Sequence, residues 1–325
     1  MNRIPVVIDS ALNADEILGL LLAKKSDMLD IKALCTIACT KDSGALVRAQ
    51  RLAAALEWDI EPVPGAEKNL YRSARELKPV FDFDETLLPE RTISDKAACP
   101  AWEVIYSEAK KSGGQLVLIA LGPLTNLAIA LAVHQDIEPM IKCVIAAGGG
   151  IIGGDATMCA EYNFYADPEA AQKVIKSRIP VYLCPADMGA RAYLTANELE
   201  DIAQCGSAES KLFSKIGLAN LEKGLRFSDK KGYPSKAAAA VLFAIDGSLF
   251  TSDECFLGVE TMSREAYGKT VTDVYSDKQY EHGNFILLDC DREGFAAKIK
   301  ELLKWRCSRA DSRERRQKRF EMRFA

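Results

Sequence analysis

Short apolar runs rich in β-branched residues alternate with stretches of helical periodicity along most of this chain. Strands are predicted for the apolar runs over 4–9, 30–38, 115–121, 143–150 and 178–184. Helices are predicted for the intervening and following stretches, over 14–25, 44–58, 96–112, 123–133 and 166–177. Strands joined by crossover helices form a parallel sheet that is covered on both faces. The alternation therefore predicts an α/β fold with an open, mostly parallel, Rossmann-like sheet.

The second half of the chain stays apolar but loses the strict alternation. Paired helices are predicted over about 196–223, and single helices over 237–246 and 292–305. Beyond residue 254 the pattern indicates antiparallel strands, which end with the run over 284–291. We therefore expect helices followed by antiparallel strands and a last helix in this half of the chain.

No linker, repeat or low-complexity segment divides the chain, so a single domain is predicted over 1–305. The remaining segment, 306–325, is predicted to be a basic tail or a helix extension. From Lys304 to Arg323 there are nine Lys and Arg residues against three Asp and Glu residues, a difference of +6. A solvated surface is the simplest interpretation of such a charge run, and an anionic partner is the alternative.

Composition narrows the functional classes. The 46 acidic residues exceed the 42 basic ones, so the net charge is −4 and nucleic acid is an unlikely partner. Two histidines are too few for a multi-histidine zinc site. The ten cysteines form no CxxC pair and several lie in apolar runs, which is typical of free thiols in a reducing compartment. With no apolar run long enough for a membrane span and no secretory pattern at the start, we expect a cytoplasmic protein without a membrane partner.

Three segments follow predicted strands, where ligands bind in open parallel sheets. The first, Asp9 to Glu16, holds three carboxylates, which either cap a helix or serve chemistry. The second is the IALGPLTN turn over 119–126, and the third is the glycine-rich stretch over 146–171. Glu161 and Asn163 in the third segment can point the same way, and a carboxylate beside an amide suits the vicinal hydroxyls of a sugar. Structural hydrogen bonding is the alternative role for this pair.

Together these segments resemble the inosine-uridine nucleoside hydrolase family. The resemblance rests on the opening IDSALNADE, on GPLTN over 122–126, and on the glycine block that ends in EYN over 161–163 and DPEAA over 167–171. It implies an open α/β fold and an enzyme that cleaves the N-glycosidic bond of ribonucleosides. It also implies a small-molecule partner, a nucleoside, pentose or related sugar, and a homodimer or homotetramer.

The same resemblance places a calcium ion at the bottom of the pocket, where it binds the ribose hydroxyls and the attacking water. The family's ligand positions fall at Ala11, Glu16, the Leu121 carbonyl and Ala237 of this sequence. Alanine stands at two positions that carry aspartates in the family, one of which is also the catalytic base. Calcium needs six to eight oxygen ligands with several carboxylates. From these substitutions we expect no cofactor, with calcium absent or weakly bound.

The positions that match ribose-contacting residues of the family are better preserved. They are the candidate ligand-binding residues Asp9, Asp15, Thr40, Asp155, Glu161, Tyr162 and Asn163. No catalytic residue is assigned with assurance; the candidates are Asp15, Glu16 and Lys236, and Lys236 falls where many members carry a histidine near the leaving base. The histidine-bearing loop of many members is missing from 66–93, so the substrate identity does not carry over.

Three functional hypotheses follow. The first is a nucleoside-hydrolase-like protein that binds a ribosyl or related sugar ligand without calcium-dependent hydrolysis. The second is an active N-ribohydrolase with a rewired, metal-independent mechanism, and the third is a non-catalytic scaffold or regulatory subunit. Whether the chain is an enzyme stays open at this point.

Overall fold

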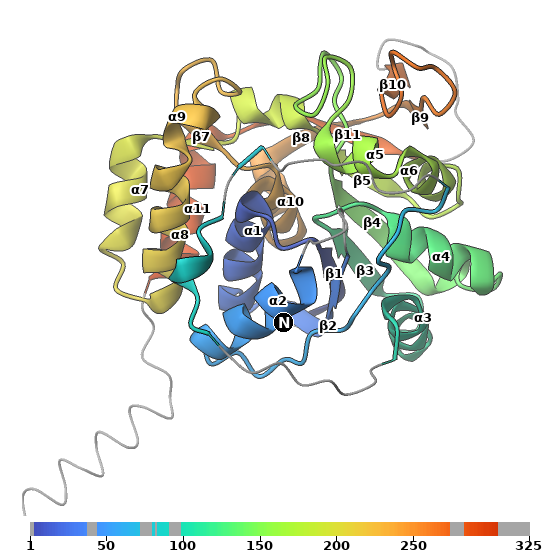
Figure 1. Cartoon of the computed structure of the whole chain (residues 1–325), viewed down its shortest axis with the longest axis horizontal. Helices are drawn as coiled ribbons and strands as arrows, with labels where there is room; N and C mark the ends of the chain where they lie inside the picture. The colour runs from blue at the N-terminus through green and yellow to red at the C-terminus, as the bar shows by residue number, and fades with distance from the viewer. Residues whose placement is uncertain are drawn as a thin grey trace, which may run out of the picture.

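A seven-stranded sheet forms the centre of the molecule in the computed structural model, which describes residues 3–37, 44–71, 80–81, 83–90, 99–273 and 283–304 (Figure 1). The strand order is β2-β1-β3-β4-β5-β11-β8. The strands of this sheet are β1 (Ile4–Ser10), β2 (Leu29–Thr36), β3 (Leu116–Ala120), β4 (Ile141–Ala147), β5 (Val181–Cys184), β8 (Phe250–Glu254) and β11 (Phe285–Cys290). All neighbouring pairs are parallel except β11 and β8. The predicted α/β class with a mostly parallel sheet is therefore confirmed.

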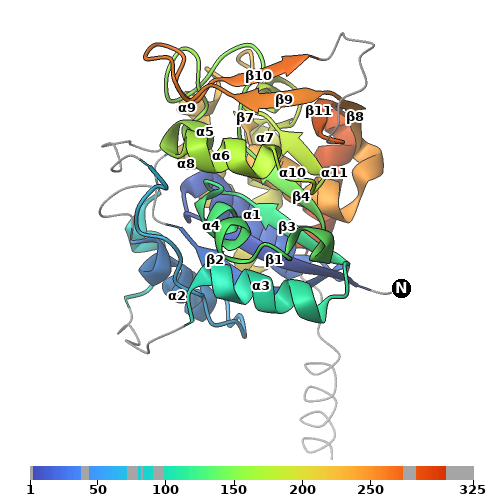
Figure 2. The same cartoon turned by 90° about the vertical axis from the view of Figure 1, so that its right-hand side faces the viewer.

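Helices cover both faces of this sheet. One apolar core joins the sheet to α1 (Ala14–Lys25), α8 (Ala208–Ala219), α10 (Lys236–Ile245) and α11 (Arg292–Leu303). A second core on the other face joins it to α3 (Ala101–Lys111), α4 (Thr125–Val133) and α6 (Pro168–Ile175). Figures 1 and 2 show these two layers on opposite sides of the sheet. The crossover helices thus bury their apolar faces as the alternating sequence pattern requires.

The remaining elements are short. They are the helices α2 (Ala45–Ala55), α5 (Tyr162–Ala166), α7 (Ala196–Ala203) and α9 (Leu221–Gly224), the 3₁₀ turns η1 (Glu85–Leu87), η2 (Glu138–Met140), η3 (Ala186–Ala190) and η4 (Gly247–Leu249), and two antiparallel pairs, β6 (Tyr193–Leu194) with β7 (Tyr233–Pro234) and β9 (Phe256–Val259) with β10 (Thr270–Asp273). Figure 2 shows β9 and β10 beyond the edge of the main sheet. Among the described residues no helix is both long enough and apolar enough to cross a membrane.

Local capping explains several element boundaries. Asp167 accepts a hydrogen bond from the Ala170 amide and Pro168 takes the first helical position, so α6 begins there. The predicted helix over 166–177 was therefore placed almost correctly. The helices predicted as a pair over 196–223 are three, because Thr195 and Ser207 each cap a new helix and the chain turns again at Asn220. The predicted tail, 306–325, lies outside the described residues.

Candidate functional site

A pocket opens beyond the carboxyl ends of β1 and β4, beside the first turns of α1 and α10. Including its open mouth, it encloses about 610 Å³. Its lining residues are Asn13, Asp15, Glu16, Val80, Phe81, Asp155, Tyr162, Asn163, Ala186, Gly189, Phe227, Pro234 and Lys236. Because parallel strands end at the same edge of a sheet, side chains from distant parts of the sequence meet there.

Glu16 closes the turn between β1 and α1. One of its oxygens accepts hydrogen bonds from the Ser10 hydroxyl at 2.7 Å and the Ala11 backbone amide at 2.5 Å, and the other accepts from the side-chain Nδ2 of Asn13 at 3.0 Å. Burial raises the pKa of Glu16 to about 7, although these hydrogen bonds favour the charged form. The carboxylate thus serves the turn while it also lines the pocket.

The same turn is held from outside by an arginine. Leu12 has a left-handed backbone (φ 58°), which is unfavourable for a branched side chain. Arg48 donates a hydrogen bond from Nη1 to the Leu12 carbonyl at 2.9 Å and pairs with Glu85 in η1. The arginine therefore ties the strained turn to the segment that carries η1.

Asp15 links the first turns of the two central helices. Its Oδ2 accepts a hydrogen bond from the Ala237 amide at 3.1 Å, whereas its Oδ1 has no hydrogen-bond partner. Asp15 is 6% exposed and burial raises its pKa. One oxygen of a buried carboxylate is therefore left for a ligand in the pocket.

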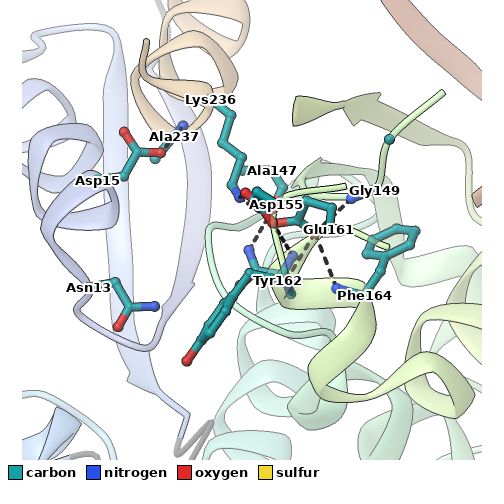
Figure 3. A network of polar contacts seen from close by, with 12 residues as sticks. Asn13, Asp15, Ala147, Gly149, Asp155, Glu161, Tyr162, Phe164, Lys236 and Ala237 are labelled. Atoms are coloured by element: carbon teal, nitrogen blue, oxygen red, sulfur yellow. Dashed lines mark hydrogen bonds and ion pairs between the residues drawn. The ribbon is translucent and has the colours of Figure 1, made fainter. Parts of the chain in front are cut away.

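Glu161 is the most rigidly held carboxylate of the site. Its Oε2 accepts three backbone hydrogen bonds, from Gly149 at 2.8 Å, Asn163 at 3.0 Å and Phe164 at 3.2 Å, and it caps α5 (Figure 3). Asn163 in turn donates from Nδ2 to the carbonyls of Leu121 and Ala147, each at 2.7 Å. These contacts join the ends of β3 and β4 to α5 and leave Oε1 of Glu161 facing the pocket side.

Lys236 approaches this carboxylate from the first position of α10. Its Nζ forms an ion pair with Oε1 of Glu161 and lies 3.4 Å from Oδ2 of Asp155 (Figure 3). Asp155 is oriented by the Tyr162 amide, which donates to its Oδ1 at 2.7 Å. Burial opposes the charge on Lys236, but the two carboxylates outweigh burial and raise the pKa of the ammonium group. Lys236 therefore carries a fixed positive charge inside the pocket.

Most of the sequence-predicted site residues meet in this one pocket. Six of them line it, namely Asp15, Glu16, Asp155, Tyr162, Asn163 and Lys236. Glu161 joins them through Lys236. Asp9 is 1% exposed and lies outside the pocket lining, where its Oδ1 accepts a hydrogen bond from Asn126 at 2.8 Å and its Oδ2 has no partner. Thr40 lies outside the described residues.

An aromatic wall of the pocket was not foreseen from the sequence. Phe81 packs edge-on against Phe227, with ring centroids 6.2 Å apart. Its ring is also tilted against that of Tyr233, with centroids 4.9 Å apart. Phe81 and Phe227 both line the pocket. Phe81 falls in the divergent stretch 66–93, where its aromatic character was the only available signal, and nothing in the sequence around Phe227 marked that residue.

Comparison with known proteins identifies the family. The sequence profile described as inosine-uridine preferring nucleoside hydrolase matches residues 6–297. The chain belongs to this family. It is 29% identical over 309 residues to a pyrimidine-specific ribonucleoside hydrolase RihA of Photobacterium profundum, covering 92% of this chain and 98% of that protein. It is 28% identical over 312 residues to the RihA of Escherichia coli K12, covering 93% and 99%.

Solved structures agree on the fold. A plant nucleoside hydrolase, PpNRh1, superposes with a TM-score of 0.82 at 24% identity and covers 94% of this chain and 100% of that one. A purine-preferring ribonucleoside hydrolase from Gardnerella vaginalis superposes with a TM-score of 0.79 at 20% identity, covering 92% and 99%. The nucleoside hydrolase fold inferred from the sequence motifs is thus confirmed.

Membership of this family corrects the expectation about calcium. Members are calcium-dependent nucleoside hydrolases, so the expectation of absent or weak calcium, drawn from two alanines, is wrong. Within the described residues the donor set itself fits the ion poorly. No three carboxylate, histidine or cysteine side chains there are grouped to hold a metal, and Ala11 and Ala237 are buried at 1% and 0% exposure.

Proposed function

We propose that this nucleoside hydrolase family member binds the ribosyl group of a nucleoside or related pentoside in the pocket, and that it hydrolyses the N-glycosidic bond slowly. The observation that carries the proposal is the contrast between Ala11 and its surroundings. A buried methyl group stands at the position of the family's catalytic base, while Asp15, Glu161 and Asn163 remain. Hydroxyl-binding groups are therefore kept where the proton acceptor is replaced.

The support for sugar binding is the pre-ordering of these polar groups. Glu161 and Asn163 are held by backbone hydrogen bonds, and Asp15 is held by the Ala237 amide. Groups that are already oriented lose little conformational entropy when a ligand binds. The unpaired Oδ1 of Asp15 gives a ligand hydroxyl a strong acceptor.

The support for slow hydrolysis is chemical. Water is a weak nucleophile near neutral pH, and removing a positioned general base commonly costs about 10²- to 10⁴-fold in rate. Ala11 has no group that could accept a proton.

The test measures binding and turnover on the same preparation, with calcium added because the family depends on it. Ribose and a panel of nucleosides are titrated by calorimetry, and release of reducing sugar is followed in parallel. We expect saturable binding of at least one ribosyl ligand. Turnover of the bound nucleoside should be about 10²- to 10⁴-fold slower than that of a hydrolase with a positioned general base. Ordinary hydrolase turnover of a nucleoside would contradict the slow-hydrolysis half, and absence of any ribosyl binding would contradict the proposal as a whole.

A specific observation favours a second candidate, an N-ribohydrolase with a rewired base. Glu16 lines the pocket, and burial raises its pKa to about 7. A carboxylate that titrates near neutral pH is a suitable general base. Such an enzyme would route the proton of the attacking water to Glu16 rather than to position 11.

Glu16→Gln separates the two candidates. If Glu16 is the base, release of ribose from the best nucleoside is expected to fall by at least about tenfold, while the dissociation constant changes little. Glu108→Gln, a half-buried position of α3 outside the pocket lining, serves as the control and should leave turnover unchanged. Equal turnover by Glu16→Gln and the unchanged protein would exclude Glu16 as the base.

Location and assembly remain proposals. We infer a cytoplasmic protein from the eight free cysteines among the described residues and a homo-oligomer from the family resemblance. Sedimentation of the purified chain tests the second inference.

A further inference from the structure

The pocket holds more acidic than basic side chains. Its charged lining residues are Asp15, Glu16, Asp155 and Lys236, and Glu161 faces Lys236 from one side. Four carboxyl groups therefore surround one ammonium group. Lys236 balances Asp155 and Glu161 by direct contact, but Asp15 and Glu16 have no cationic side chain as hydrogen-bond partner among the described residues.

The unpaired oxygen of Asp15 also indicates that a ligand belongs there. Asp15 lines the pocket, only 6% of its surface is exposed, and its Oδ1 accepts no hydrogen bond. A buried carboxylate oxygen without a partner is costly unless a ligand satisfies it. The missing partner is a hydrogen-bond donor, a positive charge or both.

Part of the lining is aromatic. Phe81, Phe227 and Tyr162 offer ring surfaces to the pocket, and Phe227 is 36% exposed. Aromatic faces attract cations, and flat rings pack well against them. The pocket thus combines an acidic region with aromatic surfaces, which suits a flat cation better than a flat neutral ring.

We propose that the preferred ligand of this pocket is a cationic N-riboside, in which ribose is joined to the ring nitrogen of a pyridinium-type base. The proposal rests on the ribosyl binding proposed above. The ribosyl hydroxyls are bound by Asp15, Glu161 and Asn163. The charged ring lies toward Phe81 and Phe227, close to the Asp15 and Glu16 carboxyl groups, whose charged forms a cation would favour.

A matched pair of ligands isolates the effect of the ring's positive charge on binding affinity. Nicotinamide riboside carries a pyridinium cation, and benzamide riboside is its neutral analogue with a carbon–carbon link to the same sugar. Calorimetric titration of the full chain with each, and with ribose as competitor, gives the preference directly. The same titrations with added calcium show whether a metal ion takes the acidic region instead. Nuclear magnetic resonance of the ligand after each titration checks that it stays intact.

We expect the cation to bind at least about tenfold more tightly than its neutral analogue, which corresponds to about 1.4 kcal/mol. Asp155→Asn and Asp15→Asn each remove a carboxylate and should reduce this ratio, whereas Asp201→Asn on the exposed side of α7 should not. Thermal unfolding of each variant confirms that it folds, and the comparison on the unchanged chain needs no variant.

Three results would overturn the inference. Equal dissociation constants for the pair, both displaced by ribose, would reject the cationic ring and leave the proposed ribosyl binding intact. A preference that disappears when calcium is added would assign the acidic region to a metal ion. No binding of either riboside or of ribose would reject the proposed function together with the inference.

Discussion

Replacing Lys236 with methionine is expected to lower the free energy of unfolding by about 3–5 kcal/mol, because it leaves a buried carboxylate without its counter-charge. Glu161 is 0% exposed in its side chain, and its Oε1 is paired with Lys236 alone among the contacts described above. Methionine keeps the length and apolar stem of lysine, so the change removes the charge with little loss of packing. Urea unfolding near neutral pH measures the loss.

Lys300→Met is the matched control. Lys300 pairs with Asp201, whose side chain is 60% exposed, and exposed ion pairs contribute only about 0–1 kcal/mol. The Lys236 variant should also recover part of its stability in mild acid, since Glu161 can then take up a proton. A loss for Lys236→Met no larger than the control's would mean that the pairing with Glu161 contributes little in solution.

A second large effect is expected from pH. Burial raises the pKa of Asp9 to about 7 from 3.8, and that of Glu16 to about 7 from 4.5. The native state therefore binds more protons than the unfolded chain between these values, so stability falls as pH rises through this window. Between about pH 5.5 and about pH 8 each group is expected to lower the free energy of unfolding by roughly 2 kcal/mol. Urea unfolding across this range measures the slope.

The Asp9→Asn variant measures how much Asp9 contributes to the pH dependence of the free energy of unfolding. Its amide oxygen can still accept from Asn126, but the side chain no longer titrates, so the loss between about pH 5.5 and about pH 8 should shrink by roughly 2 kcal/mol. Asp201→Asn should leave the slope unchanged because Asp201 is exposed. An unchanged slope in Asp9→Asn would show that Asp9 is ionised in the native state throughout this range.

Local signals made much of the fold predictable from sequence. The apolar run over 4–9 became β1 and the periodic stretch over 14–25 became α1 with the same bounds. Asp167-Pro168 marked the start of α6 because capping depends only on neighbouring residues. Carboxyl ends of parallel strands meet at one edge of a sheet, so the approximate place of the pocket followed from the segments just after the predicted strands.

Contacts between distant residues were not predictable in the same way. Lys236 and Glu161 lie 75 residues apart, and their pairing depends on how α10 packs over the end of β4. The side chain that meets a carboxylate across such a distance has no local signature. The same holds for Phe81 and Phe227, whose contact is formed by two irregular segments.

Counting substitutions gave a wrong expectation about calcium. Ala11 and Ala237 show which side chains are present, but a sequence does not show which further oxygens reach a site after folding. Membership of the family was the stronger guide.

The two edges of the main sheet bear on self-association. Next to β2, the backbone of Val63 exchanges hydrogen bonds with Leu34 and Thr36, so the chain covers part of this edge itself. The other edge is β8, whose sequence FTSDE carries the exposed side chains of Asp253 and Glu254. A second copy aligned in parallel register along β8 would bring like charges together, which opposes fibre-like growth by such strand addition. Two unrelated features thus oppose extension of the sheet, a covering segment at one edge and exposed acidic side chains at the other.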